Sequence, residues 1–155
     1  MALEIEHKYL VHHDRWKTIR PSKSVMVKQA YLYSDPSKTI RVRVMDDKGF
    51  ITIKGKSTGA SRSEYEYEIP LEDALGMIRE LANKVIEKTR HYIHHGEHVW
   101  EVDVFEGENE GLIVAEIELG SEEENYLVPD WVHENVTQDK RYANSNLLNT
   151  PFRTW

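Results

Sequence analysis

Charged residues in this chain recur at every second position within segments that otherwise have the composition of strands. The clearest case lies near the N-terminus, where Glu4, Glu6 and Lys8 alternate with Ile5 and Tyr9 on the other parity. Because the side chains of a strand point alternately to its two faces, the three charges would share one face. The same spacing returns in nearly every strand candidate, with charges of both signs. The repetition predicts a closed sheet whose interior is charged.

Alternation alone does not say which face of a strand is buried. Arg41 and Arg43, for example, alternate with Ile40, Val42 and Val44, and a two-layer sandwich with polar outer faces would give the same pattern. Three features favour the charged interior. Acidic and basic pairs are segregated by strand, arginine suits phosphate oxygens, and paired carboxylates suit Mg²⁺ or Mn²⁺. An enclosure that holds both kinds of charge suits a metal-bound polyphosphate.

The order of the expected elements defines the fold class. Strands are predicted at about residues 3–11, 26–34, 37–46, 49–56, 63–69, 85–94, 97–105 and 112–119. An amphipathic helix is predicted at 71–83, and short helices at 121–127 and 144–148. Hairpin-sized connections imply antiparallel pairing, and eight strands are enough to close a barrel. We therefore expect a mainly β, α+β fold: an eight-stranded antiparallel closed barrel, or tunnel, with a few peripheral helices, in one domain over residues 1–155.

Composition limits the classes of partner. A formal net charge of −7 argues against general nucleic-acid binding through a broad basic surface. No apolar run approaches the roughly 18 residues needed to cross a bilayer, so we expect no membrane partner. The chain has no cysteine, which excludes disulfides, thiolate zinc sites and cysteine nucleophiles. The first residues lack the features of a secretory signal, and a cytoplasmic location is expected.

The ordered set of charged motifs resembles the CYTH superfamily, also called triphosphate tunnel metalloenzymes. The signature Glu-x-Glu-x-Lys of that family is matched by Glu4, Glu6 and Lys8. Further matches follow along nearly the whole chain: Val27-Lys28-Gln29-Ala30-Tyr31-Leu32, Arg41-Val42-Arg43, Thr52-Ile53-Lys54, Glu64-Tyr65-Glu66, Glu87-Lys88-Thr89-Arg90, Val102-Asp103-Val104-Phe105, Glu116-Ile117-Glu118 and Val136-Thr137-Gln138-Asp139-Lys140-Arg141-Tyr142. One such motif would be weak, whereas the ordered set is specific.

The resemblance implies an eight-stranded tunnel in which basic residues bind a triphosphate and acidic residues bind one or two Mg²⁺ or Mn²⁺ ions. The implied substrate-binding residues are Lys8, Lys28, Arg41, Arg43, Lys54, Lys88, Arg90 and Lys140. The implied metal ligands are Glu4, Glu6, Glu64, Glu66, Asp103, Glu116 and Glu118.

The resemblance also implies three candidate catalytic residues, Lys8, Tyr31 and Lys88. Tyr31 would orient the attacking water or a phosphate, and a structural role in the barrel wall is an equal alternative for it. Two further positions stay open. Glu68 extends the acidic face of Glu64 and Glu66. Glu101 shares a face with Asp103.

The first functional hypothesis is hydrolysis of inorganic tripolyphosphate to pyrophosphate and phosphate, with a divalent metal, by an enzyme whose partner is this small molecule. The alternatives are a class IV-type adenylate cyclase, a thiamine triphosphatase, and a non-catalytic module that binds polyphosphate or nucleotide. A triphosphate site could serve all of these, so the fold does not fix the reaction. The compact chain favours the smallest substrate, and it is compatible with a homodimer.

Overall fold

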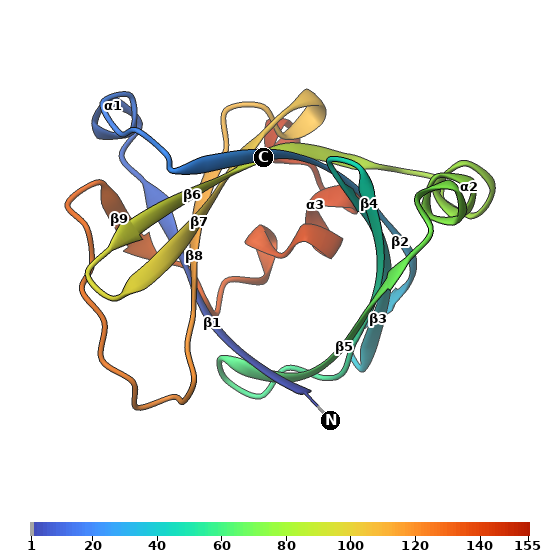
Figure 1. The fold of residues 1–155 in the computed structure, drawn as a ribbon, viewed down its shortest axis with the longest axis horizontal. Helices are drawn as coiled ribbons and strands as arrows, with labels where there is room; N and C mark the ends of the chain where they lie inside the picture. Colours follow the sequence, from blue (N-terminus) through green and yellow to red (C-terminus); the bar gives the residue numbers. More distant parts are fainter. Residues whose placement is uncertain (1) are drawn as a thin grey trace.

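The computed structural model describes residues 2–155 and contains a closed barrel of antiparallel strands (Figure 1). The strands are β1 (Ala2–Val11), β2 (Lys23–Asp35), β3 (Lys38–Met45), β4 (Lys48–Lys54), β5 (Ser61–Ile69), β6 (Ile86–His95), β7 (His98–Phe105), β8 (Ile113–Glu118) and β9 (Val132–Asn135). The α helices are α1 (His13–Trp16), α2 (Leu71–Leu81) and α3 (Asn144–Asn149), and the 3₁₀ helices are η1 (Gly107–Asn109), η2 (Lys140–Tyr142) and η3 (Phe152–Thr154).

The barrel closes because β1 pairs with strands on both of its sides. The strand order is β5-β4-β3-β2-β6-β7-β8-β1, and β5 pairs back onto β1 from Ala2 opposite Glu64 to Ile5 opposite Ser61. β9 adds a short ninth strand to β1. The prediction of an eight-stranded antiparallel closed barrel is therefore confirmed, and the open sandwich that would have given the same alternation is excluded.

Two clusters of apolar residues pack on the outside of the barrel wall, beneath the elements that cover it. Trp100, which is fully buried, belongs to a cluster with Trp131 on the side of the wall that carries β9. On another side, Val42 packs with Ala74 and Ile78 of α2. Burial of apolar area provides most of the favourable free energy of folding, so these contacts point the alternate, charged side chains into the bore.

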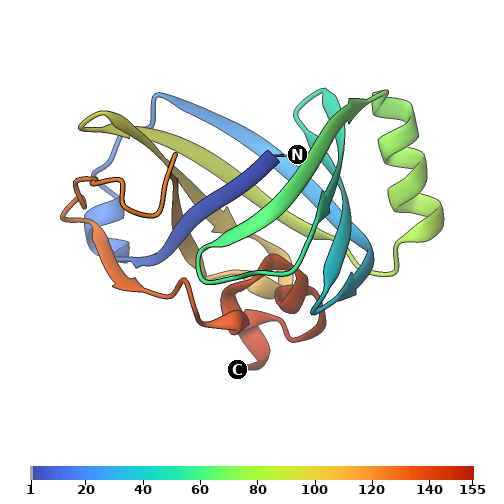
Figure 2. The same cartoon turned by 90° about the horizontal axis from the view of Figure 1, so that it is seen from below.

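Helix α3 lies across the bore in the view along the barrel, and the turned view shows it at one end of the barrel (Figures 1 and 2). Leu147 of this helix is fully buried against Ile86 and Phe105. The predicted helices at 71–83 and 144–148 are thus confirmed by α2 and α3. No helix in residues 2–155 has the length and apolar character needed to span a bilayer.

One expected helix is absent and two short elements are additional. Residues 121–127 form no helix, because the Glu124 carboxylate accepts from the Gly120 N–H at 2.6 Å and pairs with His98 at 2.5 Å, which holds the segment against the β6–β7 hairpin. Pro129 further disfavours helical backbone just before it. The short elements α1 and β9 were not predicted, since four residues show no usable periodicity.

Candidate functional site

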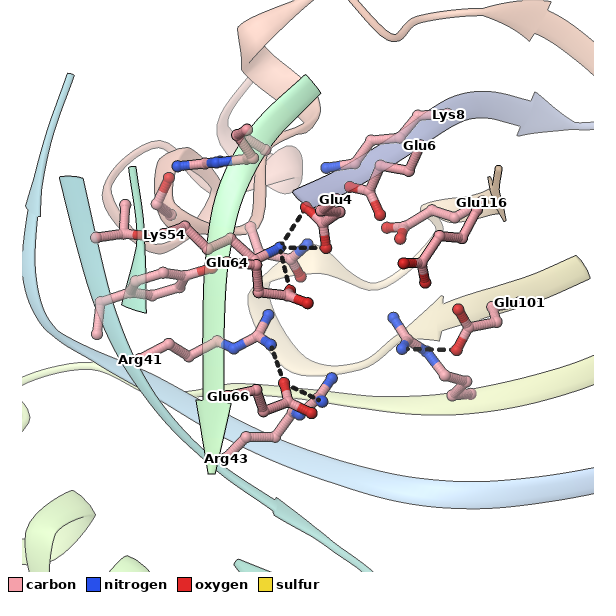
Figure 3. Close-up of a pocket in the computed structure, with 18 of the residues that line it drawn as sticks. Glu4, Glu6, Lys8, Arg41, Arg43, Lys54, Glu64, Glu66, Glu101 and Glu116 are labelled. Atoms are coloured by element: carbon pink, nitrogen blue, oxygen red, sulfur yellow. Dashed lines mark hydrogen bonds and ion pairs between the residues drawn. The ribbon is translucent and has the colours of Figure 1, made fainter. Parts of the chain in front are cut away.

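The bore of the barrel contains a cavity of about 230 Å³ whose lining is mostly ionic (Figure 3). Seven glutamates line it, namely Glu4, Glu6, Glu64, Glu66, Glu101, Glu116 and Glu118. Seven cationic residues also line it, namely Lys8, Arg41, Arg43, Lys54, Arg62, Lys88 and Arg90. The cavity therefore brings together most of the residues that the sequence analysis placed in one site.

The acidic part of the wall is formed by β1, β8 and β7. The strand register sets Glu6 directly opposite Glu118, and Glu101 directly opposite Glu116. Like charges in directly opposed positions repel each other. Burial, and then the neighbouring Glu6 carboxylate, raise the pKa of Glu116, and burial followed by Glu4 raises the pKa of Glu118. This part of the wall thus concentrates negative charge that an added cation would stabilise.

Lys8 lies on β1, within the acidic part of the wall. It projects from β1 beside Glu6 (Figure 3) and its register partner on β8 is Glu116. Burial would lower the pKa of Lys8, but the carboxylates of Glu116 and Glu6 outweigh burial and raise it. Lys8 therefore stays protonated at neutral pH.

The basic part of the wall is formed by β3, where Arg41 and Arg43 share one carboxylate. Glu66 lies 3.7 Å from Arg41 Nη2 and 3.2 Å from Arg43 Nη2, and it also accepts from Thr52 Oγ1 at 2.8 Å. The Nε–H groups of both arginines are buried and have no hydrogen-bond partner within residues 2–155. Burial, with repulsion from Arg41 and Arg90, lowers the pKa of Arg43 to about 10. Two guanidinium groups with free donors are suited to phosphate oxygens.

Lys54 connects the basic and acidic parts of the cavity. Its Nζ donates to both carboxylate oxygens of Glu4, at 2.8 and 2.9 Å, and lies 3.6 Å from Glu64 (Figure 3). Glu4 is only 7% exposed, and its burial raises its pKa despite the contact with Lys54. The charged side chains of the cavity thus pair with one another. An incoming anion or cation would have to replace one partner of such an ion pair.

The position of Asp103 differs from that of the other expected metal ligands, which line the cavity. Its side chain is 1% exposed and does not line the cavity. Both of its oxygens are occupied, by Arg90 Nε and Nη2 at 2.8 and 3.0 Å and by Lys88 Nζ at 2.7 Å. Although burial opposes ionisation, these two cations hold the pKa of Asp103 well below its usual range. The structure places Asp103 behind the cavity wall, where it positions two cations.

Lys28 and Lys140 also differ from the expected substrate-binding set. Lys28 is exposed because, on β2, it has the opposite parity to Gln29 and Tyr31, which face the barrel interior. Lys140 is exposed on η2. Neither side chain lines the cavity, and each lysine faces solvent in this structure.

The structure also shows where the residues that the sequence analysis left open are located. Glu101 lines the cavity and pairs with Arg90 at 3.0 Å. Glu68 is exposed and does not line it, so the pair on β5 that faces the bore is Glu64 and Glu66. Tyr31 lines the cavity and also packs against the apolar cluster around α3.

Two cavity residues with polar contacts were not among the expected site residues. Arg62 lines the cavity, and extending the alternation of Glu64 and Glu66 back by two positions would have found it. Asn144 is buried, and its Oδ1 accepts from Lys88 Nζ at 3.0 Å and from Gln29 Nε2 at 3.1 Å. It lies 56 and 115 residues away from these two partners, and no local pattern could have indicated those contacts.

Comparisons with known proteins agree with this geometry. The CYTH domain model matches residues 2–148. The chain is 47% identical to an inorganic triphosphatase of Acetivibrio thermocellus, over 100% of this chain and 99% of that protein. It is 34% identical to an inorganic triphosphatase of Nitrosomonas europaea, over 93% of this chain and 95% of that protein. A crystal structure of an inorganic triphosphatase superposes with a TM-score of 0.65 at 31% identity, covering 96% and 95% of the two chains. The chain belongs to the CYTH domain family.

Replacement of Asp103 tests its role behind the wall. In Asp103→Asn, Lys88 and Arg90 would lose their shared buried carboxylate, and we expect the free energy of unfolding to fall by about 3–5 kcal/mol. Urea unfolding at neutral pH measures the loss. The control is Asp139→Asn, which removes a carboxylate from the more exposed pair with Arg141 and should cost far less. Equal losses in the two variants would contradict the buried-pair account.

Proposed function

We propose that this chain hydrolyses inorganic triphosphate to pyrophosphate and orthophosphate with the help of a divalent cation. The observation that carries the proposal is the pairing, in one cavity, of arginines with free buried N–H donors and directly opposed glutamates. Basic residues alone would suit capture of a polyanion, whereas so many carboxylates would repel it unless a cation were also bound. The similarity to two inorganic triphosphatases supports the same reaction.

The size of the cavity supports the smallest substrate. At about 230 Å³ it lies below the range of roughly 300–1,000 Å³ that is usual for pockets holding drug-sized ligands. A linear triphosphate needs no room for a base, a ribose or a thiamine ring. The cavity dimensions therefore favour inorganic triphosphate over ATP, and so favour a hydrolase over an adenylate cyclase.

The cations of the cavity would bind and orient the substrate. Arg41 and Arg43 would turn their unpartnered donors to phosphate oxygens, and Arg90, held by Asp103, would face the same space. Preorganised cations of this kind stabilise the charge that develops on a transferring phosphoryl group. Lys8 would stay charged beside the acidic wall and bind the phosphate nearest to it.

The donor set of the acidic wall fits a hard divalent cation. Glu4, Glu6, Glu116 and Glu118 offer oxygen ligands only, which is the preference of Mg²⁺ and Mn²⁺. Within residues 2–155 no three carboxylate or imidazole groups already converge on a formed metal site, so these side chains would rotate to hold the ion. When bound, the ion would offset the charge of the triphosphate and lower the pKa of a water.

Product analysis tests the proposed reaction. The purified protein is incubated separately with tripolyphosphate, ATP and thiamine triphosphate, in Mg²⁺ or Mn²⁺, and orthophosphate, pyrophosphate and cyclic AMP are measured. We expect tripolyphosphate to give equal amounts of orthophosphate and pyrophosphate, at a rate well above that for the larger substrates. Cyclic AMP from ATP, with little orthophosphate from tripolyphosphate, would favour the cyclase. Tight binding of tripolyphosphate without phosphate release would favour a binding module.

Two isosteric substitutions test whether activity depends on the carboxylates in the bore or on those outside the barrel. Glu6→Gln removes one of two opposed carboxylates in the cavity, and we expect kcat for tripolyphosphate to fall by at least about 100-fold. Glu68→Gln makes the same chemical change on the same kind of strand at an exposed position, and it should leave kcat within about twofold. Steady-state orthophosphate release measures both. Full activity in Glu6→Gln would show that the wrong face had been identified.

The raised pKa values of the acidic wall predict a pH dependence of metal binding. Burial raises the pKa of Glu4, Glu116 and Glu118, and the ligands must be deprotonated to bind a metal. As the pH falls below neutral, protons would therefore compete for these groups before they reach ordinary exposed glutamates. Calorimetric titration with Mn²⁺ should show weaker binding at pH 5.5 than at pH 7.5. An affinity that stays the same over this interval would contradict the assignment of the acidic wall.

A further inference from the structure

Arg62 is a cavity residue for which neither the fold nor the ion-pair network supplies an obvious role. It lies on β5 directly opposite Glu4 of β1 and lines the bore with Glu64 and Glu66. Its Nε and Nη2 donate to the carbonyl oxygen of Gly55 at 3.2 and 2.9 Å. The side chain is half-buried, and this pair of bonds fixes the plane of its guanidinium.

The charge of Arg62 is not offset as those of the other cavity arginines are. Arg41 and Arg43 share Glu66, and Arg90 pairs with Asp103 and Glu101. Arg62 makes no ion pair with any of the residues from 2 to 155, since its acceptor is a neutral carbonyl. Its cross-strand neighbour Glu4 instead accepts from Lys54 through both oxygens. Arg62 is therefore a cavity arginine whose guanidinium is held in place by a neutral carbonyl and not by an ion pair.

The position of Arg62 along the bore indicates what it would contact. The β4–β5 connection, which lies just before Arg62, and α3 lie at the same end of the barrel (Figure 2). Residues 143–145, at the start of α3, line the same cavity as Arg62. A linear anion in the bore would thus meet Arg62 where α3 limits its length, which is the place of an end phosphate.

We propose that Arg62 binds an end phosphate group of the substrate, as a binding residue additional to the arginines of β3 and β6. The inference rests on the proposed function and assigns to Arg62 one terminal phosphate of inorganic triphosphate. The Gly55 carbonyl takes two of its donors, and the remaining donors and the positive charge are directed to the anion.

A graded set of substitutions tests this role. Arg62→Gln retains an amide donor that can reach the Gly55 carbonyl but removes the charge. We expect KM for tripolyphosphate to rise about tenfold, which corresponds to about 1.4 kcal/mol, with kcat within about threefold and an unchanged urea midpoint. Arg62→Lys keeps the charge without the planar fork and should raise KM by about threefold.

Arg15→Ala is the matched control. Arg15 is exposed outside the cavity and also donates to a backbone carbonyl, that of Asp130, at 2.6 Å. This variant removes the same kind of hydrogen bond and the same charge from the chain, so it should leave KM within twofold. A rise in KM that is equal in Arg15→Ala would overturn the inference, because it would reflect net charge alone.

The remaining outcomes separate this inference from the proposed function. If the wild-type protein hydrolyses tripolyphosphate and Arg62→Gln keeps KM within twofold, the inference about Arg62 is wrong and the proposed function stands. If Arg62→Gln lowers the urea midpoint and kcat together while KM is unchanged, Arg62 only supports the β4–β5 connection, and the inference is again wrong. If the wild-type protein releases no phosphate from tripolyphosphate, the proposed function fails first.

Discussion

The seam between β1 and β5 decides where every charged side chain of the bore lies. It consists of four register pairs, from Ala2 with Glu64 to Ile5 with Ser61. In an open sheet, the charged face of each strand could be exposed to solvent. Closure of the barrel turns these charged faces inward, where they surround the bore. Unpaired buried charges are costly, and the charged lining is tolerable because most of its cations contact carboxylates, as Lys54 contacts Glu4 and Glu64. When a substrate and a divalent cation bind, the basic side chains could pair with the substrate and the carboxylates with the cation.

The distribution of apolar residues explains why this arrangement folds. Along most of the wall the apolar clusters lie outside, beneath α2 and on the β9 side. A third cluster lies at the end of the bore that α3 covers, where Ile86 and Val114 share a face with Lys88 and Glu116. In the strands beneath the first two clusters, the outward face carries the apolar residues that stabilise the fold, and the inward face carries the charged residues of the cavity. Val42 packs under α2 while its neighbours Arg41 and Arg43 line the cavity. A one-residue slip in strand register would exchange the two faces, so the apolar packing also fixes the chemistry.

Much of the fold and of the candidate site could be predicted from the sequence, because alternation with a period of two shows which residues of a strand share a face. The eight barrel strands, α2, α3 and most cavity residues followed from it together with the family resemblance. Tertiary contacts decided the rest. Asp103 has the parity of a cavity residue, yet Arg90 and Lys88 enclose it. Lys28 lies in a matching motif but on the outward parity of β2, and the contact of Asn144 with Lys88 spans 56 residues.

Anomalous diffraction from crystals soaked in Mn²⁺ and a non-hydrolysable triphosphate analogue would test the central claim most directly, since it locates the cation without relying on turnover. The account predicts manganese signal inside the bore, within coordination distance of Glu6 and Glu116, and phosphate density against Arg41 and Arg43. Manganese bound only on the outer surface, with neither signal nor phosphate density in the bore, would contradict it.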